Sequence, residues 1–168
     1  MNSRLTFVSH SEADTDRLGG ALARALTSGI SIALNGQLGS GKTRLVRSVC
    51  AALGINTQLV NSPTFVILQL YVDGRIPVAH FDTYRLADMD EFLAIGADEY
   101  LDSEEWLNLI EWAERVAGAL PADRLTINIE QTGETDRSFE LQALGPRSGR
   151  VLERLRMGDL RTSPPAVG

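Results

Sequence analysis

Hydrophobic residues follow two different periods along this chain, and the two alternate. Short apolar or alternating runs, which are typical of β-strands, occupy residues 4–8, 30–35, 65–72, 76–81, 107–110, 124–131 and 138–144. Hydrophobic residues recur every three or four positions, as in amphipathic helices, in a segment that begins near His10 and stops at Gly29, and over 43–53, 88–95 and 113–120. This alternation predicts an α/β fold with helices on both faces of a sheet.

Two local signals refine this prediction. Asp73-Gly74 stands between the runs 65–72 and 76–81 and is a strong signal for a β-hairpin. The sheet is therefore expected to be mixed, with an antiparallel hairpin. Gly19-Gly20 lies inside the first predicted helix, where glycine is unfavourable, and indicates that this helix packs closely against the sheet.

One glycine-rich segment between a predicted strand and a predicted helix carries a chemical signature. It fits the phosphate-binding P-loop pattern G-x-x-x-x-G-K-[ST]. Its residues are Gly36, Gln37, Leu38, Gly39, Ser40, Gly41, Lys42 and Thr43. The loop N–H groups would form an anion-binding nest, Lys42 would reach the β- and γ-phosphates of ATP, and Thr43 would offer a hydroxyl to Mg²⁺. The strand–loop–helix setting predicts a P-loop NTPase-type three-layer fold.

Two carboxylates follow apolar strands and are candidates for the acidic part of a Mg-ATP site. Asp82 ends the run 76–81 and Glu111 ends the run 107–110. Ligands gather at the carboxyl edge of α/β sheets, so either acid could bind Mg²⁺ while the other orients the attacking water. The residues alone do not rank the two. Thr64, after Pro63, fits a nucleotide-sensing switch and a proline-anchored turn equally well, and His80, inside a strand, is assigned no chemistry.

Charge is distributed unevenly over the 168 residues. The net charge is −6, which argues against a protein that binds nucleic acid through its own basic surface. Residues 82–114 hold 11 of the 22 acidic residues, whereas five arginines lie in 147–168. We expect a single P-loop ATPase domain over 1–146 and an Arg-rich, partly disordered tail over 147–168, with a short basic helix at 151–160. One cysteine and no membrane-length apolar run favour the cytoplasm.

Together these motifs resemble one family, the bacterial ATPases of tRNA threonylcarbamoyladenosine biosynthesis (the TsaE family). The resemblance covers roughly residues 5–144. It rests on the P-loop, Ser-Pro-Thr-Phe at 62–65, His-Phe-Asp-Thr-Tyr-Arg-Leu at 80–86 and Glu-Trp at 111–112. The family more often has Asp and Ala where Gln37 and Ser40 stand here, and we expect both side chains to point away from the phosphates.

The resemblance implies a small ATPase with weak hydrolysis in the absence of partners. It would bind ATP and Mg²⁺, dock on the TsaD and TsaB proteins that transfer the threonylcarbamoyl group, and reset that complex between turnovers. The product would be the modified adenosine beside the anticodon of ANN-decoding tRNAs, and tRNA would be met through the complex. The resemblance favours Glu111 near the metal and the γ-phosphate, while Thr64 and Tyr84 would sense the γ-phosphate or the partner.

Two other functions fit a P-loop. A small P-loop kinase would carry a lid with several arginines to clamp both phosphoryl groups, whereas Arg85 and Arg115 are the only arginines between Tyr84 and Ala122. A regulatory module that binds nucleotide without hydrolysis is the second alternative. Phosphate release that depends on the partner proteins would distinguish the ATPase from both.

Overall fold

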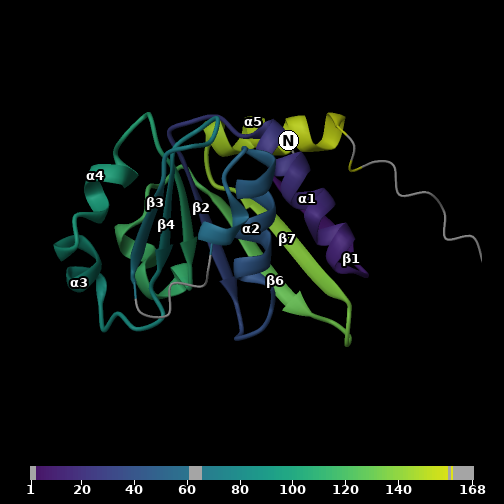
Figure 1. The fold of residues 1–168 in the computed structure, drawn as a ribbon, viewed down its shortest axis with the longest axis horizontal. Coiled ribbons are helices and arrows are strands. Elements are labelled where there is room, and N and C mark those ends of the chain that lie inside the picture. The colour runs from purple at the N-terminus through teal and green to yellow at the C-terminus, as the bar shows by residue number, and fades with distance from the viewer. Residues whose placement is uncertain (1–2, 61–65, 159, 161–168) are drawn as a thin grey trace, which may run out of the picture.

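The fold is built on one seven-stranded mixed sheet. The computed structural model describes residues 3–60, 66–158 and 160, and within them the strand order is β1-β7-β6-β2-β5-β4-β3 (Figure 1). The strands are β1 (Arg4–Ser9), β2 (Ile30–Gly36), β3 (Leu68–Tyr71), β4 (Val78–Asp82), β5 (Leu107–Glu111), β6 (Leu125–Gln131) and β7 (Arg137–Ala143). Strands β6, β2, β5 and β4 are parallel. The predicted hairpin is confirmed as the antiparallel pair of β3 and β4.

Four predicted helical segments form α-helices with shifted ends, whereas the segment 113–120 forms a kinked 3₁₀ helix. The helices are α1 (Glu12–Ala25), α2 (Lys42–Ala52), α3 (Met89–Ala94), α4 (Ala97–Leu101) and α5 (Pro146–Met157), with 3₁₀ turns η1 (Thr57–Leu59) and η2 (Ala113–Ala119). Helix α1 begins after Ser11, whose hydroxyl accepts a hydrogen bond from the Asp14 N–H, close to the start expected near His10. The helix ends before the expected stop at Gly29. Among the described residues, no helix is long and apolar enough to span a membrane.

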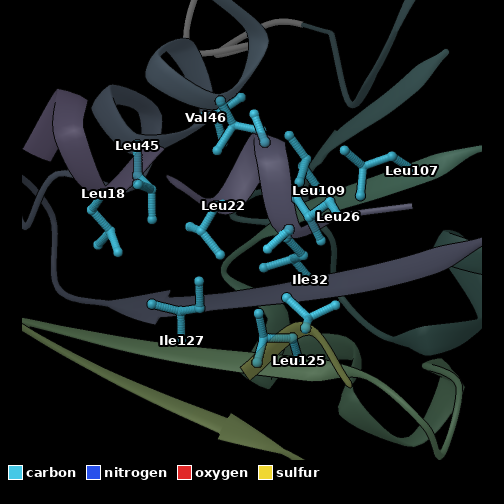
Figure 2. Packing of buried hydrophobic residues seen from close by; sticks show 14 of the residues in the cluster. Leu18, Leu22, Leu26, Ile32, Leu45, Val46, Leu107, Leu109, Leu125 and Ile127 are labelled. Atoms are coloured by element: carbon cyan, nitrogen blue, oxygen red, sulfur yellow. The ribbon is translucent and has the colours of Figure 1, made fainter. Parts of the chain in front are cut away.

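Successive side chains of the central strands point to opposite faces of the sheet. Each face therefore carries its own hydrophobic cluster. On one face, α1, α2 and α5 cover side chains such as Ile32 and Leu109. On the other, α3, α4 and η2 cover Ala33, Phe81 and Ile110. Figure 2 shows part of the larger cluster, with these labelled side chains converging: Leu18, Leu22, Leu26, Leu45, Val46, Ile32, Leu107, Leu109, Leu125 and Ile127. The expected three-layer arrangement is confirmed.

Helices α1 and α2 lie side by side and touch at a glycine. A Cβ at Gly19 would lie 2.3 Å from the Ser48 Cβ, so the close packing predicted for this glycine is against α2 and not against the sheet. Next to this contact, Arg44 and Ser48 donate hydrogen bonds to the Asp16 carboxylate. Burial alone would raise the pKa of Asp16, but the hydrogen bonds from Ser48 and Arg44 and the charge of Arg44 lower it below its usual value.

The C-terminal helix belongs to the packed core. The domain was expected to end near residue 146, but Pro146 is the first residue of α5, and Val151, Leu152 and Leu155 are buried in the larger cluster. Asp123 accepts hydrogen bonds from two N–H groups in the first turn of α5, which fixes the start of the helix. The basic helix expected at 151–160 therefore exists but begins earlier, and residues 161–168 lie outside the described part of the chain.

Candidate functional site

The P-loop connects β2 to α2 at the carboxyl edge of the parallel strands. Gly41 precedes α2 with φ 109° and no side chain caps the helix, so the first N–H groups of α2 are left for another acceptor. Gly39 also has a positive φ of 77°, a conformation that glycine adopts without strain. The loop therefore presents a glycine backbone followed by an uncapped helix N-terminus, as a phosphate site requires.

Lys42 lies at the centre of this loop. Its ammonium donates hydrogen bonds to the carbonyl oxygens of Gly36 (2.6 Å) and Gln37 (2.9 Å). The nitrogen also lies 3.8 Å from the centre of the Trp112 ring, a cation–π contact. Burial lowers the pKa of Lys42, while the surrounding carboxylates, Glu111 first, oppose that shift. The charged group is thus held inside the loop by two carbonyls and one aromatic face.

Ser40 and Gln37 differ in where they lie. Ser40 is buried, and its hydroxyl is 3.4 Å from the Lys42 ammonium, whereas its orientation relative to the phosphates stays a prediction. Gln37 is exposed, and Leu38 at the tip is 82% exposed. The Ser40 hydroxyl therefore adds a polar group beside the Lys42 ammonium.

Glu111, the last residue of β5, contacts the P-loop helix directly. The Thr43 hydroxyl donates to its Oε1 over 2.7 Å. The other oxygen, Oε2, lies 2.6 Å from His80 Nε2, and both side chains are almost fully buried. His80 Nδ1 in turn lies 3.2 Å from the Tyr71 hydroxyl. The structure thus links Thr43, Glu111, His80 and Tyr71 in one continuous chain of hydrogen bonds.

Asp82 lies beside Glu111 in the register of β4 and β5 but makes a different contact. Its Oδ1 accepts a hydrogen bond from the Tyr84 N–H over 3.0 Å. Burial raises the pKa of Asp82, and the nearby charge of Glu111 raises it further, against the opposing effects of the Tyr84 hydrogen bond, His80 and Lys42. Both predicted acids therefore reach the same edge, and of the two, Glu111 is hydrogen-bonded to Thr43. Thr64 lies outside the described residues.

His80 is the residue of this site that sequence reasoning missed. A lone histidine in an apolar strand gives no chemical signal. The signal that could have found it is the two-residue alternation of β4, which places His80 and Asp82 on one face, combined with a parallel neighbour that ends in Glu111. That combination requires knowing which strands pair.

A groove opens beside the P-loop and was not predicted by any motif. It has a volume of about 660 Å³ and lies between the start of α1 and the β6–β7 hairpin, lined among others by His10, Ser11, Gly39 and Arg137. Arg137 Nε donates to the carbonyl oxygen of Ser40 over 3.0 Å, which ties the hairpin to the loop. A planar group of the size of a nucleoside has room there.

An aromatic contact leads from Lys42 to the surface. Trp112 has a left-handed backbone, with φ 58°, and its ring centre lies 4.8 Å from that of Tyr84. Tyr84 is half-exposed, and the Arg115 guanidinium lies over its ring at 5.1 Å. The side chain that covers the Lys42 ammonium is therefore in contact with a residue that another molecule could touch.

Known proteins resemble this chain over most of its length. The family model for the threonylcarbamoyl adenosine biosynthesis protein TsaE matches residues 9–139. The tRNA threonylcarbamoyladenosine biosynthesis protein TsaE of Bacillus subtilis (strain 168) is 40% identical over 128 residues, 76% of this chain and 78% of that protein. Its counterpart from Treponema pallidum (strain Nichols) is 39% identical over 132 residues, 79% and 96% of the two chains.

A solved structure of another protein has a similar fold. A crystal structure of YdiB from Bacillus subtilis matches with a TM-score of 0.77 and 28% sequence identity, over 94% of this chain and 97% of that one. The resemblance that the P-loop, the His-Phe-Asp-Thr-Tyr-Arg-Leu segment and the Glu-Trp pair suggested is thereby confirmed. The chain belongs to the TsaE family of tRNA threonylcarbamoyladenosine biosynthesis proteins.

Proposed function

We propose that this protein is an ATPase that binds Mg-ATP and supports threonylcarbamoylation of the adenosine beside the anticodon in ANN-decoding tRNAs. It does so by docking on the TsaD and TsaB proteins and resetting that complex between turnovers. The observation that carries the ATPase part is the contact of Thr43 with Glu111 beside the Lys42 ammonium. The coupling to tRNA modification rests on membership of the family.

The donor set fits Mg²⁺ bound with a nucleotide. Magnesium prefers oxygen ligands and keeps several waters, so it needs few protein groups. Thr43 and Glu111 supply a hydroxyl and a carboxylate in direct contact, and Asp82 supplies a second carboxylate nearby. Among the described residues, no three His, Cys, Asp or Glu side chains gather into a metal site of their own. The metal would therefore be held partly by the phosphates, and would neutralise their charge.

Each residue of the site has a role that follows from its position. The N–H groups of the loop and of the first turn of α2 bind the phosphates. Lys42 exchanges its two carbonyl partners for phosphate oxygens and stabilises the charge that develops during hydrolysis. Thr43 and Glu111 would hold the metal, His80 would keep Glu111 in place, and Asp82 would orient the attacking water. The groove beside the loop takes the nucleoside.

Coupling to the partner proteins would pass through the aromatic contact. When Lys42 moves to the phosphates, the face of Trp112 that it covers is released, and Trp112 is in contact with the half-exposed Tyr84. A partner that touches Tyr84 would then favour one of the two positions of Lys42. A ligand shifts such an equilibrium only as far as it binds one state better than the other.

The test is reconstitution of tRNA modification with TsaD and TsaB, with and without the full chain. We expect the chain to increase multiple turnover, Lys42→Ala to abolish ATP binding, and Glu111→Ala to keep binding but lose hydrolysis. Glu99→Ala, an exposed acid on α4, is the matched control and should behave as wild type. Normal hydrolysis by Glu111→Ala contradicts the role of that residue.

Three other outcomes would contradict the proposed function itself. No stimulation of multiple turnover would contradict the link to tRNA modification. Transfer of labelled phosphate to a metabolite, in place of phosphate release, would identify a kinase. Phosphate release that stays at background in the presence of both partners would leave a non-hydrolysing regulatory module.

A further inference from the structure

Tyr71 is a buried polar residue outside the Mg-ATP site. It lies on β3, is 4% exposed and packs in the larger hydrophobic cluster. Its hydroxyl lies between two polar groups, because it donates to Gln69 Oε1 over 2.6 Å and lies 3.2 Å from His80 Nδ1. The hydroxyl thus connects the edge strand of the sheet to the histidine that contacts Glu111.

The register of the β3–β4 hairpin places Tyr71 where it reaches this histidine. Gln69 is directly opposite His80, and Tyr71 is opposite Val78, two residues away on the same face. Diagonal neighbours of an antiparallel pair are within reach of an aromatic side chain. The ring centres of Tyr71 and His80 are accordingly 6.1 Å apart, with their planes tilted by 38°. A slip of the hairpin by one residue would turn Tyr71 to the other face of the sheet.

The orientation of the His80 ring decides which of its atoms meets Glu111. The carboxylate of Glu111 only accepts hydrogen bonds, so Nε2, which lies 2.6 Å away, carries a proton. A half-turn of the ring about its Cβ–Cγ bond would put carbon atoms where the two nitrogens lie and break both contacts. A phenol oxygen both donates and accepts, so the Tyr71 hydroxyl can partner Nδ1 with or without a proton there. The hydroxyl therefore holds the ring in the orientation that Glu111 needs.

Glu111 depends on this orientation because its other partner has a second task. One oxygen of the carboxylate accepts a hydrogen bond from the Thr43 hydroxyl over 2.7 Å, and the other contacts His80. In the proposed Mg-ATP complex the Thr43 hydroxyl is a metal ligand as well, whereas His80 has no second role there. His80 is therefore a contact of Glu111 that does not depend on the nucleotide, and both side chains are almost fully buried.

The surroundings keep Tyr71 a neutral phenol. Burial raises the pKa of Tyr71 well above its usual value, and the negative charge of Glu111 raises it further. The hydroxyl therefore keeps its proton at neutral pH and acts as a fixed hydrogen-bonding group, not as a charged one.

We propose that Tyr71 is a positioning residue for ATP hydrolysis, which acts on Glu111 through the His80 ring. The proposal rests on the proposed function, since Glu111 acts there on Mg-ATP. It gives the edge strand β3 a part in the chemistry, although β4 and β5 lie between β3 and the P-loop strand β2. The effect should fall on kcat and not on ATP binding, because Lys42 and the loop backbone are not members of this chain of contacts.

The first test is the kinetics of Tyr71→Phe, which removes one oxygen atom and leaves the ring in the core, so folding should be unaffected. With TsaD and TsaB present, kcat for phosphate release should fall about three- to tenfold, as expected for one buried hydrogen bond, while KM for Mg-ATP stays within about twofold of wild type. Tyr100→Phe is the matched control, because the Tyr100 hydroxyl makes no hydrogen bond within the described residues. It should behave as wild type.

A second variant separates the hydroxyl from the rest of the hairpin. Gln69→Leu removes the other partner of the Tyr71 hydroxyl but leaves the hydroxyl beside His80 Nδ1. Its kcat should stay within about twofold of wild type. A kcat lowered as far as that of Tyr71→Phe would mean that the strand matters and not the contact with His80, and would overturn the proposal.

Nitrogen-15 NMR of the nucleotide-free protein follows the His80 ring without any measurement of activity. The chain has two histidines, and His10 is 70% exposed, so its signals serve as an internal reference. His80→Leu assigns the signals. Tyr71→Phe should shift the Nδ1 signal of His80 and leave those of His10 in place. A wild-type kcat, a lowered kcat with unchanged His80 signals, or a raised KM with an unchanged kcat each overturns the proposal.

The two proposals fail separately. If wild type releases no phosphate with both partners but Tyr71→Phe shifts the His80 signal, the positioning of His80 by Tyr71 stands and the proposed function falls. If wild type hydrolyses ATP and Tyr71→Phe does so equally well, the positioning role is wrong and the proposed function stands.

Discussion

Replacing His80 by leucine tests whether this buried histidine holds the key carboxylate of the ATP site. Leucine is close to histidine in size, so the core around a fully buried position keeps most of its packing. The change removes the 2.6 Å contact with Glu111 and the 3.2 Å contact with Tyr71. Glu111 then keeps the Thr43 hydroxyl, and Tyr71 keeps its 2.6 Å hydrogen bond to Gln69.

The expected loss follows from these contacts. A buried hydrogen bond to a charged group contributes about 1.5–3 kcal/mol, and a neutral one about 0.5–1.5 kcal/mol. Because Tyr71 retains a partner, the smaller contribution is largely recovered, and His80→Leu should lower the free energy of unfolding by about 2–3 kcal/mol. In a chain of this size the melting temperature should fall by roughly 5–10 °C.

Urea unfolding followed by circular dichroism measures the effect. His80→Gln is the matched variant, because its side-chain amide can donate to Glu111 where Nε2 does, and it should recover part of the loss. A double-mutant cycle with Glu111→Ala should show a coupling of about 1 kcal/mol or more. Wild-type stability of His80→Leu, no recovery with glutamine, or additive effects in the cycle would each refute this role of His80.

Two further predictions concern the contact between α1 and α2. Gly19→Ala should destabilise the protein by about 1–3 kcal/mol through overpacking against Ser48. At Gly20 an added Cβ would have its nearest neighbour at 3.5 Å, so Gly20→Ala should be neutral or stabilising by up to about 1 kcal/mol. Equal melting temperatures for the two variants would contradict this packing. The lowered pKa of Asp16 means that its stabilising effect is present above its unfolded pKa near 3.9 and is lost as the pH falls through the lower folded value. Asp16→Asn should therefore destabilise the protein at pH 7 and flatten the acid side of the stability curve below about pH 4, and an unchanged pH profile in urea melts would disprove this.

The elements of this fold could be predicted from the sequence because their signals are local. Apolar alternation located every strand of the sheet, Asp73-Gly74 identified the hairpin, and the spacing of Gly36, Lys42 and Thr43 identified the P-loop. Element ends are predicted less closely, since which of several neighbouring polar residues caps a helix depends on what else each of them contacts. At the start of α1, Ser11 caps the helix while the Ser9 hydroxyl is used in a buried hydrogen bond to Thr15.

Residues far apart in the sequence meet only through strand order and helix packing, and these contacts could not be predicted. The pairing of β4 with β5 brings His80 to Glu111, and the approach of α2 brings Thr43 to the same carboxylate. The same applies to Ser48 opposite Gly19 and to Arg147 beside Glu104. None of these pairs has a spacing rule, because the distance between them depends on every element that lies between.

The sequence by itself determined that this chain is an α/β protein with a P-loop, and which acids stand at the ends of its strands. Propensity, periodicity and a short motif carry that information within a few residues. The tertiary structure alone decided that Glu111 is the acid in contact with Thr43, that the Ser40 hydroxyl lies beside Lys42, and that α5 completes the core. The physical reason is that burial and contact are properties of the whole packed chain, and no local segment encodes them.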